Sequence, residues 1–411
     1  MANVSSSNGL EKRPKLRFPG FDEPWNESKL SACFAKNIKK NTDGRISNVI
    51  CNSAKMGLIP QRDYFDKDIA NSDNTSGYYI IEHNDFVYNP RKSSDAPYGP
   101  ISRYACPDAG IVSPLYLCFR AKGDVDTNFF EWYFRSFAWH RYIYMTGDSG
   151  ARHDRVSIKD DDFFSMPIRF PSSIEQKKIA SFLSAIERRI SFQQLLVDNL
   201  KKYKRGVMQH IFRRTTTQSV KAWTCVRLGD IFKKVSRRNT DGLVKNVITN
   251  SAEYGLIPQR DFFDKDIAVD GNTANYYVIE KGDFVYNPRK SNTAPYGPFN
   301  RYTLDEKGII SPLYTCLVLK ADIYPSYLAW YFKSDAWYRY IYDNGSQGVR
   351  HDRVSMTDDL LMGIPVIFPD QAKQQEYADI LDKIDARLQA AQKVYDLLIK
   401  EKCGYMQQLF I

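Results

Sequence analysis

Two long stretches of the chain place apolar residues three and four positions apart, which is the spacing of one helix face. One stretch follows Pro171 and the other follows Pro369, and neither contains a proline. We predict helices over 172–214 and 370–411, each about 60 Å long at 1.5 Å per residue. Neither helix can bury its apolar face alone, so we expect the two faces to meet. The predicted seam consists of Ile186, Leu196, Leu200, Ile384, Val394 and Leu398.

The regions that precede these helices have a different pattern. Short runs of β-branched and aromatic residues, such as 77–81 and 85–88, are bounded by Asn, Gly and Pro, which is typical of short strands and turns. Helical patterns follow at FFEWYFRSFAWHRYIY and YLAWYFKSDAWYRYIY. We predict mixed α/β globules over 1–171 and 215–369, with residues 1–20 loose.

The chain is a tandem duplication. DFVYNPRKSSDAPYGP from Asp85 recurs as DFVYNPRKSNTAPYGP from Asp283, an offset of 283 − 85 = 198 positions. GLIPQRD, SPLY and RHDRVS recur at the same offset. The first helix leads from one globule to the next, so the second helix must run back to lie along it. The predicted fold is α+β: two mixed globules joined by two long antiparallel coiled-coil helices, arranged as a pseudo-two-fold dumbbell.

Composition narrows the class of protein. A formal net charge of +10 favours an anionic partner such as nucleic acid. The seven cysteines are scattered without CxxC spacing, so we expect neither a metal site nor a disulfide framework, and we expect a cytoplasmic location. We recognise no signal peptide and no run of about 20 apolar residues that could span a bilayer.

Motifs for catalysis are missing, whereas motifs for binding anions are repeated. The sequence contains no phosphate loop and no glycine-rich cofactor loop. The histidines of RHDRVS have no evident nucleophile, and two interpretations stay open for this motif, an anion contact or a salt-bridged loop. Arg suits phosphate and guanine edges, and Asn suits adenine edges. The predicted DNA contacts are Asn89, Arg91, Lys92, Ser93, Tyr98, Arg103, Arg152, His153 and Arg155, with their counterparts Asn287, Arg289, Lys290, Ser291, Tyr296, Arg301, Arg350, His351 and Arg353.

The duplicated order of these motifs resembles the specificity subunit of Type I restriction–modification systems. The resemblance is carried by Trp25 and Trp223 near the start of each globule, by DFVYNP…GIVSPLY and DFVYNP…GIISPLY, and by helices ending in GVMQHIF and GYMQQLF. It implies that 1–171 and 215–369 are target-recognition domains, each of which reads one half of a split site in double-stranded DNA. It implies that 172–214 and 370–411 are spacer helices on which two methyltransferase subunits dock.

The resemblance also implies a division of labour. The chain itself would not be an enzyme, and S-adenosylmethionine, ATP and magnesium would bind only to partner subunits, including motor–nuclease subunits where these are present. Two other functions stay open: a stand-alone DNA-modifying or DNA-cleaving enzyme, and a scaffold that binds no DNA.

The similarity of the two repeats predicts half-sites that form a near-palindrome. Few differences could break that symmetry. They are Met56 against Tyr254, Ser94-Asp95 against Asn292-Thr293, Ile101-Ser102 against Phe299-Asn300, and TGDSGA from Thr146 against NGSQGV from Asn344.

Overall fold

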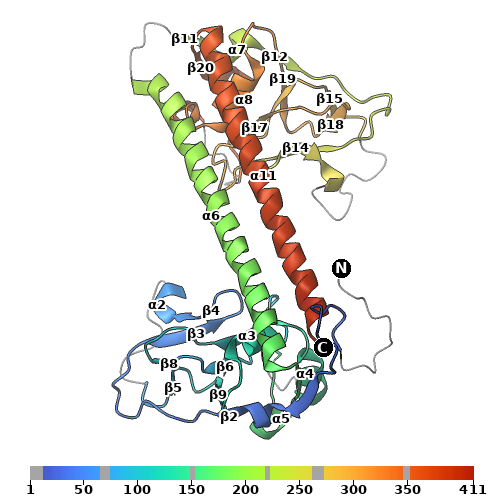
Figure 1. Ribbon diagram of the computed structural model, residues 1–411. Helices are drawn as coiled ribbons and strands as arrows, with labels where there is room; N and C mark the ends of the chain where they lie inside the picture. Colours follow the sequence, from blue (N-terminus) through green and yellow to red (C-terminus); the bar gives the residue numbers. More distant parts are fainter. Residues whose placement is uncertain (1–12, 65–74, 149–152, 218–222, 262–272, 346–351) are drawn as a thin grey trace. The chain divides into compact units, whose positions relative to one another are not determined.

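The computed structural model describes residues 13–64, 75–148, 153–217, 223–261, 273–345 and 352–411 (Figure 1). The chain divides into two compact units. The first unit combines Met1–Gln194 with Lys393–Ile411, and the second comprises Leu195–Gln392. Each unit therefore holds one sheet-rich globule and one half of each long helix. The fold is mixed α+β, as the sequence predicts.

The first globule is built on two four-stranded sheets and one two-stranded sheet. One sheet is antiparallel in the order β2-β9-β6-β7, and the other has the order β4-β3-β8-β5 with β3 and β8 parallel. Its strands are β1 (Asn26–Lys29), β2 (Phe34–Lys36), β3 (Val49–Ser53), β4 (Gly57–Pro60), β5 (Tyr79–Ile81), β6 (Phe86–Tyr88), β7 (Ile101–Arg103), β8 (Gly110–Val112), β9 (Leu117–Ala121) and β10 (Pro167–Phe170). Its helices are α1 (Leu30–Cys33), α2 (Gln61–Tyr64), α3 (Thr127–Arg135), α4 (His140–Thr146) and α5 (Asp160–Phe164).

The second globule repeats this plan. Its antiparallel sheet has the order β12-β19-β16-β17, and a parallel bridge between Val247 and Ile309 stands where β3 and β8 pair in the first globule. Its strands are β11 (Thr224–Arg227), β12 (Phe232–Val235), β13 (Ile248–Ser251), β14 (Gly255–Pro258), β15 (Tyr277–Ile279), β16 (Phe284–Tyr286), β17 (Phe299–Arg301), β18 (Gly308–Ile310), β19 (Thr315–Leu319) and β20 (Pro365–Phe368). Its helices are α7 (Leu228–Ile231), the 3-10 helix η2 (Gln259–Asp261), α8 (Pro325–Lys333), α9 (Tyr338–Asn344) and α10 (Asp358–Met362).

The core of the first globule is aromatic. The ring of Phe34 lies 5.4 Å from those of Phe86 and Phe119 and 5.1 Å from that of Phe130, each in an edge-to-face arrangement. Fully burying a side chain of this size stabilises a fold by about 1.5–3 kcal/mol. Phe86 and Phe119 lie on β6 and β9, so this cluster holds α3 on the sheet from which the functional loops emerge.

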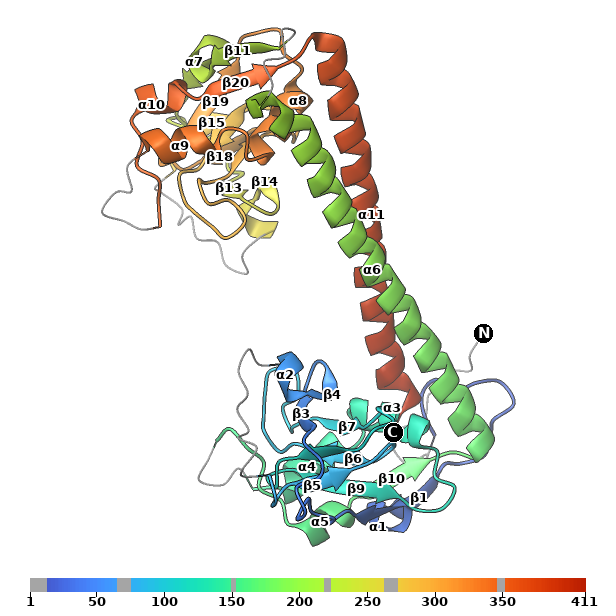
Figure 2. The same ribbon diagram turned by 90° about the vertical axis from the view of Figure 1, so that its left-hand side faces the viewer.

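The long helices are α6 (Ser173–Thr217) and α11 (Gln371–Leu409), and they lie side by side in the views of Figures 1 and 2. In the first unit, the ring of Phe182 meets that of Tyr405 at 5.1 Å, and Glu187 pairs with Lys402 at 2.6 Å. The residue numbers of the contacts increase along α6 while they decrease along α11, so the two helix segments are antiparallel in this unit. In the second unit, Lys204 of α6 pairs with Asp385 of α11 at 2.5 Å.

Three of the residues predicted for the seam are buried and two are exposed. Leu200, Ile384 and Leu398 are buried, and Ile186 is half-buried. Leu196 and Val394 are 40% and 41% exposed, whereas Val197 is fully buried. One residue turns a helix by about 100°, so a seam that includes Val197 points Leu196 away from the partner helix.

Each globule is completed by the end of a helix from the other repeat. Phe410 lies in the first unit, where its ring is 5.7 Å from Phe129 and 6.2 Å from Tyr133. Its counterpart Phe212, at 410 − 212 = 198 positions earlier, lies in the second unit, where its ring is 5.7 Å from that of Tyr327. Neither repeat therefore supplies the segment that closes its own core.

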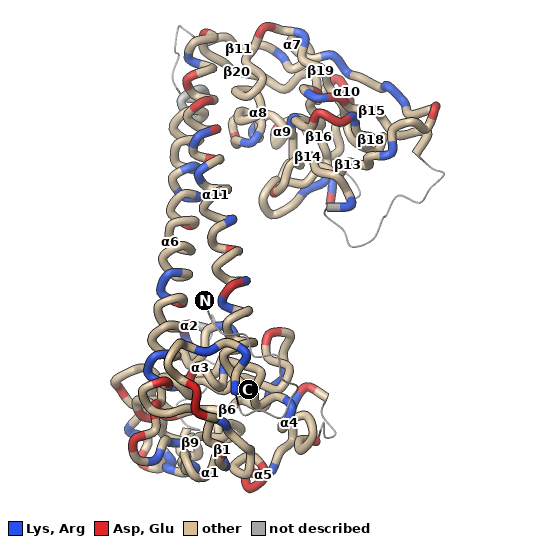
Figure 3. The backbone as a smooth tube through the Cα atoms, turned by 45° about the vertical axis from the view of Figure 1, so that its right-hand side comes forward, with Lys and Arg blue, Asp and Glu red and all other residues tan. Residues whose placement is uncertain are grey.

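Charged residues of both signs are interspersed along the two long helices (Figure 3). This pattern is typical of helices with one solvated face, because charged side chains are seldom buried unless they are paired. Within the described ranges, no helix has the length and apolarity required to cross a membrane.

Candidate nucleic-acid interface

The loop between β6 and β7, and its counterpart between β16 and β17, is here called the proline loop (residues 89–99 and 287–297). The amide of Asn89 donates to the carbonyl of Pro100 at 3.0 Å and closes the loop. Gly99 has φ +82°, and a Cβ there would lie 2.1 Å from the Asn89 carbonyl oxygen. Gly297 has φ +86° and the same close approach to Asn287. Only glycine fits these positions, so both loops close in the same way.

A buried tyrosine under each proline loop restrains it further. The hydroxyl of Tyr88 donates to the carbonyl of Tyr98 at 2.8 Å, and Tyr286 donates to Tyr296 at the same distance. Burial raises the pKa of both hydroxyls well above the usual value, so they remain protonated donors.

The proline loop lies against the RHDRVS segment. The amide of Lys92 donates to the carbonyl of Asp154 at 2.8 Å, and the amide of Val156 donates to that of Pro90 at 2.9 Å. Arg91 and Arg155 face each other as a short antiparallel bridge. The second unit repeats these bonds at Lys290 with Asp352, at Val354 with Pro288, and at Arg289 with Arg353. Two motifs far apart in the sequence thus form one surface in each unit.

We call the side chains at this junction the arginine bridge (Arg91, Asp154 and Arg155; Arg289, Asp352 and Arg353). Nε of Arg91 and Nε of Arg155 both lie 3.8 Å from one carboxylate oxygen of Asp154. In the second unit the corresponding distances are 3.5 and 3.8 Å.

Each arginine bridge has one carboxylate for two guanidinium groups, which leaves it positively charged. The side chains of Arg91 and Arg289 are 68% and 66% exposed. Exposed ion pairs contribute only about 0–1 kcal/mol to stability, so these side chains can turn to another anion at small cost. A guanidinium fork matches both phosphate oxygens and the guanine edge.

The tip of hairpin β3–β4, here called the hairpin tip (residues 54–56), lies beside the proline loop. Figure 2 shows this hairpin next to β7. The side-chain amide of Asn52 donates to the carbonyl of Val87 at 2.8 Å, and Lys55 pairs with Asp95 of the proline loop at 3.6 Å. In the second unit, Asn250 donates to Val285 at 2.9 Å and so places the matching tip, residues 252–254.

The SPLY turn adds an apolar side chain to this surface. In the first unit the amide of Tyr116 donates to the carbonyl of Ser113 at 3.0 Å, and Leu115 between them is exposed. Burial raises the pKa of the Tyr116 hydroxyl, and the charge of nearby Arg91 opposes this rise. The Tyr116 side chain is therefore within electrostatic reach of Arg91, and Leu115 is the exposed residue of the same turn. Leu313 is exposed in the same way in the second unit.

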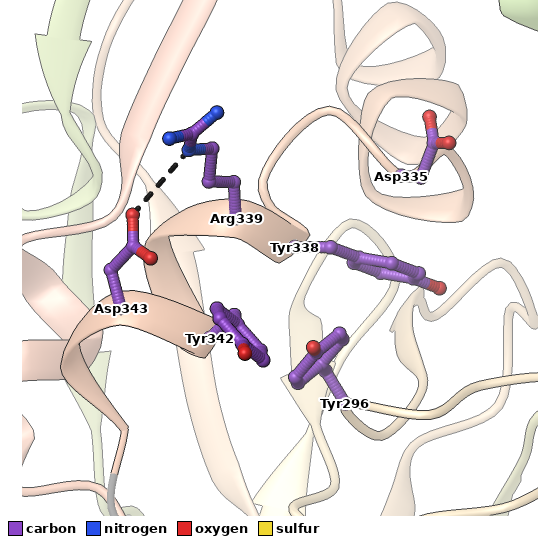
Figure 4. A pocket seen from close by; sticks show the side chains of 6 residues that line it. All are labelled: Tyr296, Asp335, Tyr338, Arg339, Tyr342 and Asp343. Atoms are coloured by element: carbon purple, nitrogen blue, oxygen red, sulfur yellow. Dashed lines mark ion pairs between the residues drawn. The ribbon is translucent and has the colours of Figure 1, made fainter.

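The base of the second proline loop borders a cavity of about 500 Å³, which is drawn in Figure 4. The rings of Tyr296 and Tyr338 are 5.0 Å apart, and Arg339 pairs with Asp343 at 3.5 Å. The full lining is Tyr296, Asp335, Tyr338, Arg339, Tyr342 and Asp343.

The corresponding place in the first unit has different chemistry. Tyr98 packs on His140 at 5.0 Å, while Phe137 and Met145 replace the two aspartates. Burial lowers the pKa of His140 to about 4, so this ring is neutral at pH 7.

Eleven of the predicted contact residues lie on the exposed face or at the base of the proline loop, and three others are not described. On the exposed face lie the arginine bridge, the half-buried Lys92 and Lys290, and the exposed Ser93, Ser291 and His153. Tyr98 and Tyr296 are half-buried at the base of the loop. Arg152, Arg350 and His351 lie outside the described residues.

Four of the predicted DNA contacts are partly or fully buried within the fold. The side chain of Asn287 is 6% exposed. The side-chain NH2 groups of Asn89 and Asn287 donate to the carbonyls of Asn52 and Asn250, and their side-chain oxygens accept from the amides of Arg91 and Arg289. Arg103, on β7, binds Glu131 at 2.8 Å and Asn84 at 2.6 Å. Arg301 on β17 is half-buried, and burial lowers its pKa. Asn89, Asn287 and Arg103 therefore bond within the framework, whereas Arg301 is half-buried in it.

Sequence reasoning missed Lys55 and the role of Asp154 as the shared partner of two arginines. A signal for Lys55 was present, because aligning the repeats places Glu253 opposite it and reverses the charge. Among the residues that the structure describes, no group of three or more His, Cys, Asp or Glu side chains could hold a metal ion.

Comparison with known proteins gives a match in structure alone. No family model and no curated protein matches the sequence. The Type-I restriction-modification system S subunit from M. genitalium matches with a TM-score of 0.55 and 14% identity, over 97% of this chain and 99% of that chain. A chain from a type I R-M system, solved in a study of complex assembly and conformational transition, matches with a TM-score of 0.56 and 15% identity, over 95% and 98% of the two chains. The two repeats and their long helices therefore have the fold of a Type I restriction–modification specificity subunit.

Proposed function

We propose that this chain is the DNA-recognition subunit of a Type I restriction–modification complex and reads a bipartite, near-palindromic DNA site. The observation that carries the proposal is the arginine bridge. The same main-chain hydrogen bonds build it in both units, and it leaves Arg91 and Arg289 exposed with an excess of positive charge. A chain with the specificity-subunit fold and two such surfaces is suited to read two half-sites.

The proposed surface combines the contact types that DNA recognition needs. The arginines supply contacts to phosphate or guanine, and lysines such as Lys92 add charge. The hairpin tip presents side chains that differ between the two units, and Leu115 of the SPLY turn can meet a thymine methyl group. The rigid glycine-closed loop fixes the distance between these groups, which is what discrimination among bases requires.

We further propose that two methyltransferase subunits dock on the long helices. In support, large apolar side chains are exposed along them, and exposed apolar patches mark interaction sites. In the first unit they include Phe192, Val394 and Leu397, and in the second Leu195, Leu196 and Tyr203. S-adenosylmethionine, ATP and magnesium would belong to those methyltransferases and to motor–nuclease subunits, with this chain as the non-catalytic, cytoplasmic member.

Methylome sequencing of the host with and without this gene tests the proposal. We expect one split adenine-methylation motif to disappear with the gene and to return on complementation. Purified chain incubated with S-adenosylmethionine should methylate nothing. A methylome that does not depend on the gene, or turnover by the chain alone, would overturn the proposal and favour a different activity.

A further inference from the structure

We propose that four exposed positions in each unit determine the bases at which the two half-sites differ. They are Lys55, Met56, Ser94 and Asp95 in the first unit and Glu253, Tyr254, Asn292 and Thr293 in the second. The inference rests on the proposed function and deepens it by naming the specificity-determining residues.

The framework around these positions is the same in both units and therefore cannot distinguish two sequences. The arginine bridge has the same residue types, and the proline loops close through the same main-chain bonds. The SPLY turn presents Leu115 in one unit and Leu313 in the other, with equal exposure. Contacts made by these groups should be common to both half-sites.

The two repeats also differ at residues 101–102 of β7 and 299–300 of β17, where the side chains have a structural role. Ile101 and Phe299 are both buried in the core. Ser102 donates to the side chain of Asn52 at 2.7 Å, and its counterpart Asn300 donates to that of Asn250 at 2.8 Å while it is 6% exposed. Ser102 and Asn300 therefore hold the hairpins in place and are not available to contact bases.

Two other differences, at residues 55–56 and 94–95, lie where the hairpin tip meets the proline loop. Lys55 is 76% exposed and pairs with Asp95, which links the two segments. In the second unit Glu253 replaces Lys55 and Thr293 replaces Asp95, so both charges of the pair change together. An exposed pair adds little to stability, and the fold does not require this change, since the framework bonds are present in both units.

The substitutions also change what the tip can recognise. A lysine suits the O6 and N7 acceptors of guanine, whereas a glutamate accepts from the N4 amino group of cytosine. Met56 is apolar, and Tyr254 adds a phenol hydroxyl at the same exposed place. We therefore expect the half-site read by the first unit to hold guanine where the other holds cytosine, each half-site taken in the direction of its own unit.

Exchange of the four positions tests the inference in the native host. One allele carries Lys55→Glu, Met56→Tyr, Ser94→Asn and Asp95→Thr, and the reciprocal allele carries Glu253→Lys, Tyr254→Met, Asn292→Ser and Thr293→Asp. Methylome sequencing should show that the first allele converts the motif into an inverted repeat of the second half-site. The reciprocal allele should produce an inverted repeat of the first half-site, and each preference should shift by about tenfold or more.

Two control exchanges sharpen the result. Phe137→Asp with Met145→Asp converts the base of the first proline loop toward the chemistry of Figure 4, and it should leave the motif unchanged. Exchange of TGDSGA from Thr146 for NGSQGV should also leave it unchanged. A motif that follows either control exchange and not the four positions would overturn the inference.

Other outcomes are equally decisive. A wild-type motif with two identical halves, or an unchanged motif in both exchange alleles, would overturn the inference but leave the proposed function standing. A wild-type methylome that does not depend on the gene would instead remove the proposed function itself. If an exchange allele loses methylation, the purified variant is checked by thermal melting and used to select from a randomised duplex library. A folded variant that selects the wild-type sequence, or none, overturns the inference.

Discussion

The exchange of helix ends between the repeats predicts that one substitution in the last turn of the chain weakens the first globule. Phe410 is 7% exposed, and Trp25, Phe129 and Tyr133 surround it at centroid distances of 6.5, 5.7 and 6.2 Å. Truncating a buried phenylalanine to alanine costs about 3–5 kcal/mol, because transfer energy is lost and a cavity remains. Phe410→Ala should therefore destabilise the first unit by that amount.

Hydrogen exchange with mass spectrometry measures this effect locally. Backbone amides of β6 (Phe86–Tyr88) report on the first unit and those of β16 (Phe284–Tyr286) on the second. A loss of about 3–5 kcal/mol accelerates exchange through unfolding by roughly two to three and a half orders of magnitude. We expect Phe410→Ala to accelerate exchange in β6 and to leave β16 nearly unchanged.

Phe212→Ala is the matched control, since Phe212 is fully buried beside Tyr327 and Tyr331 at 5.7 and 5.9 Å. It should produce the opposite result, with fast exchange in β16 and slow exchange in β6. If Phe410→Ala accelerates β16 as much as β6, or accelerates neither, the assignment of each helix end to the globule of the other repeat is refuted.

Three further predictions address the surface, a buried titratable group and the long helices. Arg91→Ala with Arg289→Ala should lower the slope of log affinity for DNA against log salt by about one unit per charge while the melting temperature stays within a degree or two; an unchanged slope would return these arginines to a purely structural role. Because burial lowers the folded-state pKa of His140 to about 4, the unfolded state takes up a proton first as pH falls, and stability present above about pH 6.5 is lost between there and pH 4. His140→Tyr, the residue of the second repeat, should therefore gain melting temperature relative to wild type from pH 7.5 to pH 5, and a pH-independent difference would contradict this. Phe192→Glu should abolish co-purification with the methyltransferase and leave melting unchanged, whereas Ile174→Glu, an equally exposed control, should not; equal effects of both would argue against docking at Phe192.

Much of the fold follows from the sequence because its signals are local or repeated. A helical period that runs for about 40 residues predicts a long helix without knowledge of what it packs against, and α6 covers Ser173–Thr217 as such a pattern requires. The constant offset of 198 positions shows that both repeats share one plan, and the structure bears this out in the matching order of β2-β9-β6-β7 and β12-β19-β16-β17.

Only the tertiary structure decides which residues of a shared motif reach the surface. The NPRK motif predicts Asn287 and Arg289 equally as contacts. Asn287 is nevertheless buried, and its side-chain amide donates to the carbonyl of Asn250 in a hairpin far away in the sequence. Arg103 is drawn from the exposed face by Glu131 on α3, and the second repeat has alanine at that place. Which residues form the seam depends on the rotation of the helix about its axis. A shift of one residue, from Leu196 to Val197, changes the direction of the side chain by about 100°. In each case the exposure of the side chain depends on a contact with a residue far away in the sequence. A local sequence pattern does not contain that contact and therefore cannot determine which side chains are buried.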